Sequence, residues 1–362
     1  MANQIAHLAV SSEEYRKLGL KKKVIQQFED GIRTTGKKGE FEWWYYDAKM
    51  NDGSTLVLTF FLNNATDTSG GFHPSVKIEL TRADGTEVSD RVFVDENDCE
   101  FSKTRCNVKI GENVFEGDLK TYHILVKTDK IEADISLEGN VAAWRSATGH
   151  IYFGDDKYFA WFPSVPEGIT RASIKVDGKV EKYEGTGYHD HNWGNAPMMD
   201  VLHHWYWGRA KIGPYTVISC YITSTKKYGY THLPIFMLAN GEKLICDNPN
   251  NINFHQLEPA YSENTRKHYH KTLVYDYKGK EGHYKITYKF KNIISSFSLL
   301  ADGGKEPSKI QTTLLRVVGL DPTYDRFNGE ATIEKIENGK VTETYTNPAT
   351  WEMMYFKRDK DV

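Results

Sequence analysis

Short, regularly spaced strand patterns constrain the fold of this 362-residue chain more than any other feature. Runs of β-branched and aromatic residues recur roughly every 8–12 residues and are separated by turn signals, a spacing typical of an all-β sandwich or barrel. The runs that predict strands are residues 41–47, 55–62, 76–80, 123–126, 133–137, 150–153, 158–162, 205–210, 215–223, 232–238, 271–277, 284–290, 312–318, 331–336 and 351–356. The segments that predict tight turns are Asp52-Gly53, Asp84-Gly85, Asp177-Gly178, Asn240-Gly241, Asp302-Gly303-Gly304 and Asn338-Gly339.

The number of predicted strands indicates two β units rather than one. On the order of fifteen to twenty strands exceed the roughly 8 to 10 that one small barrel holds, and 362 residues correspond to about two domains of ordinary size. We therefore expect two β-barrel or sandwich units packed side by side, over residues 1–185 and 186–362. The first unit would begin with a lead-in segment, residues 1–38, in which residues 11–31 have a weak helical pattern.

Composition limits the partners and the location of the protein. The chain carries 46 Lys and Arg against 49 Asp and Glu, a net charge of −3, without the basic stripe expected for nucleic-acid or anionic-membrane binding. It has neither an apolar run of about 18 residues for a transmembrane helix nor the pattern of a secretory signal. The thiols are Cys99, Cys106, Cys220 and Cys246. These cysteines are scattered and include no C-x-x-C pair, which favours reduced thiols in a cytoplasmic protein. The sequence leaves the oligomeric state open.

Two parts of the chain concentrate the side chains that could carry chemistry. Residues 185–195 read GTGYHDHNWGN and precede HHWYWGR at residues 203–209, which together hold four of the thirteen histidines and three of the eight tryptophans. Residues 40–47 read EFEWWYYD, and a strand with aromatic side chains on both faces needs cover on both, as at a seam between two units. Side chains alternate across a strand, so the predicted faces of the HDH segment are Tyr188, Asp190 and Asn192 against His189, His191 and Trp193. Those of the earlier segment are Glu42, Trp44 and Tyr46 against Trp43, Tyr45 and Asp47.

The carboxylates in these segments are candidates for a general acid. A carboxyl flanked by Trp and Tyr is desolvated, which raises its pKa and can leave a proton available near neutral pH. Asp190 and Glu42 fit this description. In the alternative interpretation the aromatic residues fill a core and Asp190 accepts hydrogen bonds that brace its surroundings.

A metal site is a competing interpretation of the same segment. His189 and His191, two residues apart on a strand, could bind zinc together with His203 or His204. No H-E-x-x-H motif, cysteine pair or acidic calcium loop accompanies them. We therefore predict no metal, and the missing G-x-G-x-x-G, P-loop and G-x-S-x-G patterns favour neither a nucleotide nor a serine nucleophile.

The order EWWYY, GYHDHNWG and WYWGR resembles a lipocalin-like family. This family includes carotenoid 1,2-hydratase (hydroxyneurosporene synthase), AttH-like proteins, kievitone hydratase and the fungal lipocalin-like Diels–Alderases, and the resemblance spans about residues 40–356. It implies two lipocalin-like β units, a hydrophobic pocket in or between them, no organic cofactor, and an isoprenoid or polyene substrate. The matching positions are Glu42, Trp43, Trp44, Asp190, His191, Asn192, Trp193 and Gly194, with Trp205, Trp207 and Arg209 nearby. Residues 211–224 contain no acid, so a carboxylate expected there in the carotenoid hydratases is missing.

Three functions fit these residues. In the first, Asp190 or Glu42 protonates a C=C bond, aromatic faces hold the carbocation, and water oriented by His191 or Tyr188, or an internal double bond, quenches it. In the second, a pericyclase folds a polyene and polarises its carbonyl group with a hydrogen-bond donor. The predicted donors for that role are Trp193, Tyr206 and Tyr46. In the third, the protein is a lipocalin-like carrier that returns its apolar ligand unchanged.

Overall fold

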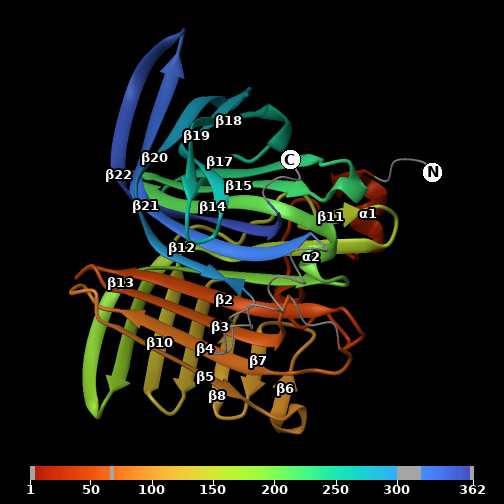
Figure 1. Ribbon diagram of the computed structural model, residues 1–362, viewed down its shortest axis with the longest axis vertical. Helices are drawn as coiled ribbons and strands as arrows, with labels where there is room; N and C mark the ends of the chain where they lie inside the picture. Colours follow the sequence, from red (N-terminus) through yellow and green to blue (C-terminus); the bar gives the residue numbers. More distant parts are fainter. Residues whose placement is uncertain (1–4, 66–68, 300–318, 359–362) are drawn as a thin grey trace. The chain divides into compact units, whose positions relative to one another are not determined.

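The computed structural model describes residues 5–65, 69–299 and 319–358, which form two curled antiparallel sheets (Figure 1). Strands make up most of the described chain, and this confirms the all-β, lipocalin-like prediction. The predicted strand at residues 312–318 and the predicted turn at residues 302–304 lie outside the described residues.

Contacts divide the chain into two compact units. The N-terminal unit contains Leu8–Tyr152 and Asp156–Pro197, and the C-terminal unit contains the described residues from Met198 onward with 5–7 and Phe153–Asp155. Residue 185, near which the sequence suggested the boundary, lies inside a strand of the N-terminal unit, and the main division falls between Pro197 and Met198. The reason is that the strand bearing the HDH segment is hydrogen-bonded along most of its length to two neighbours in that unit.

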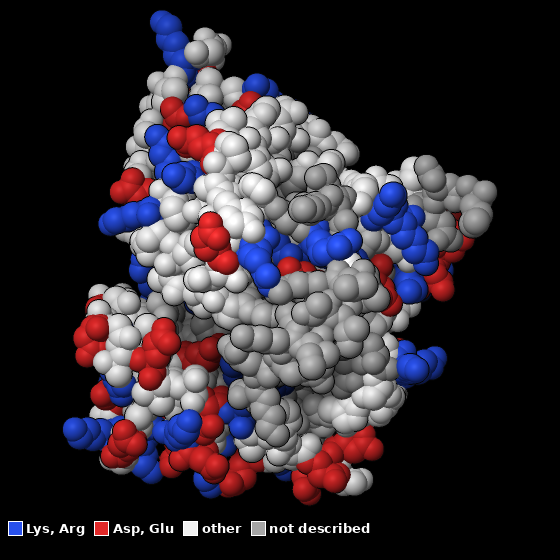
Figure 2. Space-filling view, viewed as in Figure 1, with Lys and Arg blue, Asp and Glu red and all other residues white. Residues whose placement is uncertain are grey.

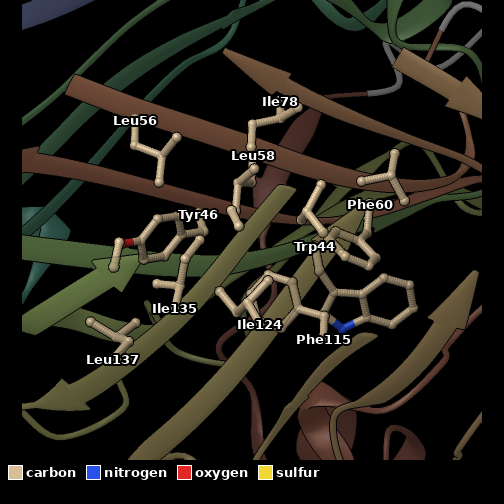
Figure 3. Close-up of a cluster of buried hydrophobic side chains, with 14 of the residues drawn as sticks. Trp44, Tyr46, Leu56, Leu58, Phe60, Ile78, Phe115, Ile124, Ile135 and Leu137 are labelled. Atoms are coloured by element: carbon tan, nitrogen blue, oxygen red, sulfur yellow. The ribbon is translucent and has the colours of Figure 1, made fainter. Parts of the chain in front are cut away.

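The first sheet provides the frame for the HDH and EWWYY segments. In spatial order its strands are β5 (Glu87–Phe93), β4 (Ser75–Thr81), β3 (Thr55–Asn63), β2 (Phe41–Met50), β13 (Lys179–Gly194), β12 (Lys157–Val176), β10 (Ile131–Gly139), β9 (Thr121–Lys127), β8 (Asn113–Gly117), β7 (Asn107–Ile110) and β6 (Cys99–Phe101), while β11 (His150–Phe153) pairs with β1 (Ala6–Leu8) and β12. The sheet curls until strands far apart in this order meet, since the rings of Phe60 on β3 and Phe115 on β8 lie 5.4 Å apart. Figure 3 shows the core inside the curl, with Trp44 and Tyr46 among aliphatic side chains.

Strand β12 is much longer than the predicted strand at residues 158–162. It runs for 20 residues, and its pairing with β13 shifts register between Pro163 and Val165 and again before Gly168. Prolines are normally confined to edge strands or bulges, and Pro163 directly follows the predicted strand. The bulges accommodate this proline, and the strand continues.

The lead-in segment is only partly helical. Helix α1 (Ser12–Lys17) begins with a capping box, in which the Ser11 and Glu14 side chains each bind the other's backbone N–H. A 3-10 turn, η1 (Gln27–Asp30), follows further on. Gly31 then passes so close to the Lys103 backbone that a Cβ atom would lie 2.7 Å from its carbonyl carbon, which fixes the path of the segment against the sheet.

The second sheet has its own aromatic core. Its order is β17 (Lys243–Cys246), β16 (His232–Asn240), β15 (Tyr215–Ser224), β14 (Leu202–Ile212), β22 (Lys340–Lys357), β21 (Leu320–Glu337), β20 (Gly282–Ser298), β19 (Lys267–Gly279) and β18 (Ile252–Ser262). The Tyr221 and Phe254 rings, on β15 and β18, stack 4.1 Å apart, so this sheet also curls. Besides α1 and η1, the described chain contains the short helices η2 (Glu96–Asp98), α2 (Met198–Val201), η3 (Lys226–Tyr228) and η4 (Pro249–Asn251).

The surface matches the near-neutral composition. Acidic and basic side chains are intermixed on the face shown in Figure 2. In the described part of the chain, no helix has the length and apolarity needed to cross a membrane.

Candidate active site

The two predicted segments lie on adjacent strands of the N-terminal unit. Strand β13 pairs antiparallel with β2, so that His191 faces Trp44, Asp190 faces Tyr45 and Trp193 faces Glu42. The predicted alternation follows, with one set of side chains turned into the core and the other turned away from it. As a result, the two candidate acids, Asp190 and Glu42, lie on opposite faces of the sheet and cannot act on the same atom.

Glu42 is held on the core face by four hydrogen bonds. The backbone N–H of Arg33 donates to Oε1 at 2.7 Å, and Thr34 donates to Oε2 from its backbone N–H at 2.8 Å and its hydroxyl at 2.5 Å. His191 Nε2 lies 2.8 Å from Oε1. Glu42 is fully buried, and its bonds tie the lead-in segment to β2 and β13. The geometry therefore gives Glu42 a bracing function.

Asp30 lies behind this pair and was not identified from the sequence. Its Oδ2 atom accepts from the Tyr122 hydroxyl at 2.5 Å and lies 3.2 Å from His189 Nε2. Burial alone would raise the pKa of Asp30, but His189, His191 and Tyr122 outweigh it and hold this pKa below its ordinary value. His189 Nδ1 lies 2.8 Å from the Tyr45 carbonyl oxygen, which only accepts, so this nitrogen carries a hydrogen. Asp30 is the middle residue of an unremarkable Glu-Asp-Gly run, and only the curled sheet brings it to these partners.

Asp30, Cys106 and His189 form a group whose donor atoms could hold a metal ion. One ligand atom from each lies within 4.8 Å of the others, and all three residues are buried. These atoms also have protein partners, since the Cys106 thiol donates to the Phe115 carbonyl oxygen at 3.6 Å and Asp30 accepts from Tyr122. The earlier zinc candidates are divided, because His189 and His191 lie in the N-terminal unit and His203 and His204 in the C-terminal unit.

Asp190 lies on the opposite face and has a different environment. Its carboxylate accepts from the Tyr188 hydroxyl and the Trp161 indole N–H, each at 2.7 Å on Oδ2, and from the Asn192 amide at 2.7 Å on Oδ1. Burial raises the pKa of Asp190 to about 6, and the three donors limit the rise. An appreciable fraction of Asp190 is therefore protonated just below neutral pH. Burial likewise raises the pKa of Tyr188, which keeps its hydroxyl a donor.

The other predicted donors and motif residues, which are the candidates for substrate binding, are distributed between the two units. Trp44 is fully buried and donates from its indole to the Asp30 carbonyl oxygen, and Tyr46 shares a 2.5 Å hydrogen bond with Thr170 in the core. On β14 of the C-terminal unit, Tyr206 points into that unit's core and accepts from the His270 backbone N–H. The other face of β14 carries the side chains of Trp205, Trp207 and Arg209. There the Trp205 indole N–H donates to the Glu352 carboxylate.

A cavity of about 170 Å³ lies within the N-terminal unit, on the face of the sheet that carries Trp193. The lead-in segment, β11, β12 and β13 all contribute to its walls. The lining residues are Leu18, Leu20, Phe28, Glu29, Arg33, Arg145, Thr148, His150, Tyr158, Phe162 and Trp193. Arg145 and Glu29 form a buried ion pair at 2.6 Å. Of these eleven residues only Trp193 was a predicted site residue, because the others come from segments without a recognisable motif.

We expect His150 to make the protein sensitive to mild acid. Burial lowers the pKa of His150 to about 4 from an ordinary 6.5, so between these pH values the unfolded chain binds a proton that the folded chain does not. Stability should therefore fall as the pH drops through this window, by up to about 1.4 kcal/mol per pH unit from this group. Urea unfolding of the wild type and His150→Gln between pH 4 and 7 measures the effect. The variant should lose that part of the slope, whereas exposed His123→Gln should keep it, and equal slopes for His150→Gln and wild type would refute the assignment.

Comparison with known proteins agrees with this fold. A family model described as Diels-Alderase-like matches residues 21–291. The quinolone epoxide rearrangement protein of Emericella nidulans is 36% identical over 83 residues, which are 23% of this chain and 22% of that protein. The hydroxyneurosporene dehydrogenase of Chlorobaculum tepidum is 24% identical over 213 residues, 47% of this chain and 53% of that protein. The chain thus matches these relatives over about a fifth to a half of their length.

A solved structure supports the fold over nearly the whole chain. The crystal structure of CghA with Sch210972 superposes with a TM-score of 0.62 at 12% sequence identity, and covers 93% of this chain and 97% of that one. This match shows a shared fold, while the family model covers most of the residues that carry the candidate site. Together with the paired EWWYY and HDHNWG strands, these findings confirm the family resemblance seen in the sequence: the chain belongs to the Diels-Alderase-like family.

Proposed function

We propose that this protein is an enzyme that cyclises or hydrates an unsaturated, hydrophobic small molecule of secondary metabolism without an organic cofactor. Membership of the Diels-Alderase-like family supports small-molecule chemistry. The names of the two relatives, which refer to a quinolone epoxide rearrangement and to hydroxyneurosporene, point in the same direction.

The buried carboxyl of Asp190 is the observation that carries the proposal. With a pKa of about 6 it can hold a proton and release it within the ordinary pH range. The proton would pass from Asp190 to one carbon of a C=C bond, leaving a carbocation on the other carbon. Water can then add and return a proton to Asp190, or an internal double bond can attack the cation before a proton is lost. Trp161, in contact with Asp190, provides an aromatic ring that stabilises positive charge.

A pericyclic reaction is the second candidate, and the cavity beside Trp193 favours it. Such a reaction needs a pocket that folds the substrate and a donor that polarises its carbonyl group. The Trp193 indole lines the cavity, and no hydrogen bond to it is formed by the described residues. In this mechanism no proton moves to carbon.

Turnover in deuterated water distinguishes the candidates. Compounds extracted from the purified protein would be returned to it in ²H₂O and the products analysed by mass spectrometry and NMR. Protonation by Asp190 should place one non-exchangeable deuterium on carbon, because that carboxyl exchanges with solvent. A product without carbon-bound deuterium would contradict the acid mechanism and support the pericyclic one, and unchanged compounds would indicate a carrier.

A further inference from the structure

The cavity of the N-terminal unit has the size of a single ring. At about 170 Å³ it is comparable to the roughly 150 Å³ cavity that accommodates benzene in another protein. Much of its lining is apolar or aromatic, with Phe28, Phe162 and Trp193 among the walls. The His150 and Trp193 rings are nearly perpendicular, at 80° with centroids 5.4 Å apart, and so form a corner that a flat ring can contact.

Besides the Trp193 indole, two neutral polar groups of the lining have no protein partner among the described residues. His150 Nδ1 donates to the Thr148 carbonyl oxygen at 3.0 Å, which leaves Nε2 as an acceptor. The Tyr158 hydroxyl is a donor, since burial raises its pKa to about 12. The two rings lie 5.4 Å apart, and within the described chain no group forms a hydrogen bond with His150 Nε2 or the Tyr158 hydroxyl. The His150 side chain is 93% buried, and its Nε2 atom is left to a ligand or water in the cavity.

The charged groups of the lining are already engaged. Arg145 is paired with Glu29, and Arg33 donates from Nε to the Gly31 carbonyl oxygen and from a terminal nitrogen to that of Lys103. Besides the Trp193 indole N–H, the groups left for a ligand are therefore one neutral acceptor, His150 Nε2, and one neutral donor, the Tyr158 hydroxyl. A single hydroxyl matches both, because it donates one hydrogen bond and accepts another.

We propose that this cavity binds a hydroxylated aromatic ring, a monocyclic phenol or the phenolic end of a larger molecule. The ligand hydroxyl donates to His150 Nε2 and accepts from Tyr158, and the ring lies against Trp193. The inference concerns binding and does not require the reaction proposed above. Its test measures affinity without turnover, so the two proposals can fail separately.

The experiment compares 4-methylphenol with 4-methylanisole on the unmodified full-length protein. The methyl ether keeps the ring but cannot donate, so calorimetry or ligand-observed NMR should give it at least about ten-fold weaker binding. His150→Phe and Tyr158→Phe should each weaken 4-methylphenol about three- to ten-fold. Tyr183→Phe removes the same oxygen from a tyrosine of β13 whose hydroxyl donates to Glu181, and should leave the affinity unchanged.

Two results would overturn the proposal. One is equal affinity for the phenol and its methyl ether, or no detectable binding of either. The other is undiminished phenol binding in both folded variants. If His150→Phe fails to fold, Tyr158→Phe and the ligand comparison on unmodified protein still decide the question.

Discussion

Replacing Asp190 with asparagine is expected to lower kcat by about 10²- to 10⁴-fold, the range typical of losing a general acid. The amide has nearly the same shape and can still accept from Tyr188 or Trp161, but it has no proton to transfer to carbon. Substrate binding, measured separately, should change only a few-fold. Asp134→Asn, the same substitution at an exposed position on β10, should retain full turnover. Wild-type kcat in Asp190→Asn would restrict Asp190 to bracing the strand and leave the pericyclic mechanism as the better candidate.

The pH profile tests the same assignment independently. Because the protonated form of Asp190 is the active one, kcat should decline as the pH rises through about 6. Tyr188→Phe removes a donor that stabilises the carboxylate, so this limb should shift to higher pH. A merely structural role for Tyr188 would lower the rate without shifting the limb.

The local features of this fold could be predicted because they depend on side-chain alternation and turn chemistry. The Asn338-Gly339 turn is an example, since both residues have positive φ in the β21–β22 hairpin, as an Asn-Gly hairpin turn requires. The opposite faces of Tyr188–Trp193 follow from the two-residue period of a strand. The desolvation of Asp190 was predicted from flanking aromatic residues, although the tryptophan that contacts it is Trp161 of β12 and not Trp193, which lies on the other face of β13.

The parts that could not be predicted depend on how the sheet closes. Asp30 meets Tyr122, 92 residues further along the chain, only because the lead-in segment enters the curled sheet. His150 and Tyr158 become cavity residues for the same reason. Tyr46 and Tyr206 show the converse, because alternation alone did not reveal that each points into a core with its hydroxyl engaged. Contacts between residues far apart in the sequence depend on the tertiary fold, so a local sequence pattern does not predict them.

Asp30→Asn is expected to lower the free energy of unfolding by about 3–5 kcal/mol, the usual cost of removing one partner from a buried ionic pair. Asp30 is completely buried, and the substitution takes a carboxylate away from His189 and Tyr122 together. Denaturant unfolding at pH 7 measures the loss. The low pKa of Asp30 means that its carboxylate stabilises the fold above the ordinary carboxyl range and that this contribution disappears as the pH falls. The difference between the variant and the wild type should therefore shrink in acid.

The exposed pair His123–Asp134 is a matched control for this prediction. Its Nε2–Oδ1 distance is 3.0 Å, close to the 3.2 Å between His189 and Asp30, but its side chains are 46% and 65% exposed. Asp134→Asn should therefore change stability by at most about 1 kcal/mol. A similar loss in both variants would show that burial of the Asp30 cluster is not the cause of the loss in stability.

The position of Asp30 adds a second consequence, because Phe28 and Arg33, which line the cavity, belong to the same lead-in segment. Loosening that segment should weaken 4-methylphenol binding in Asp30→Asn but not in Asp134→Asn, which would connect the buried cluster to the shape of the ligand cavity.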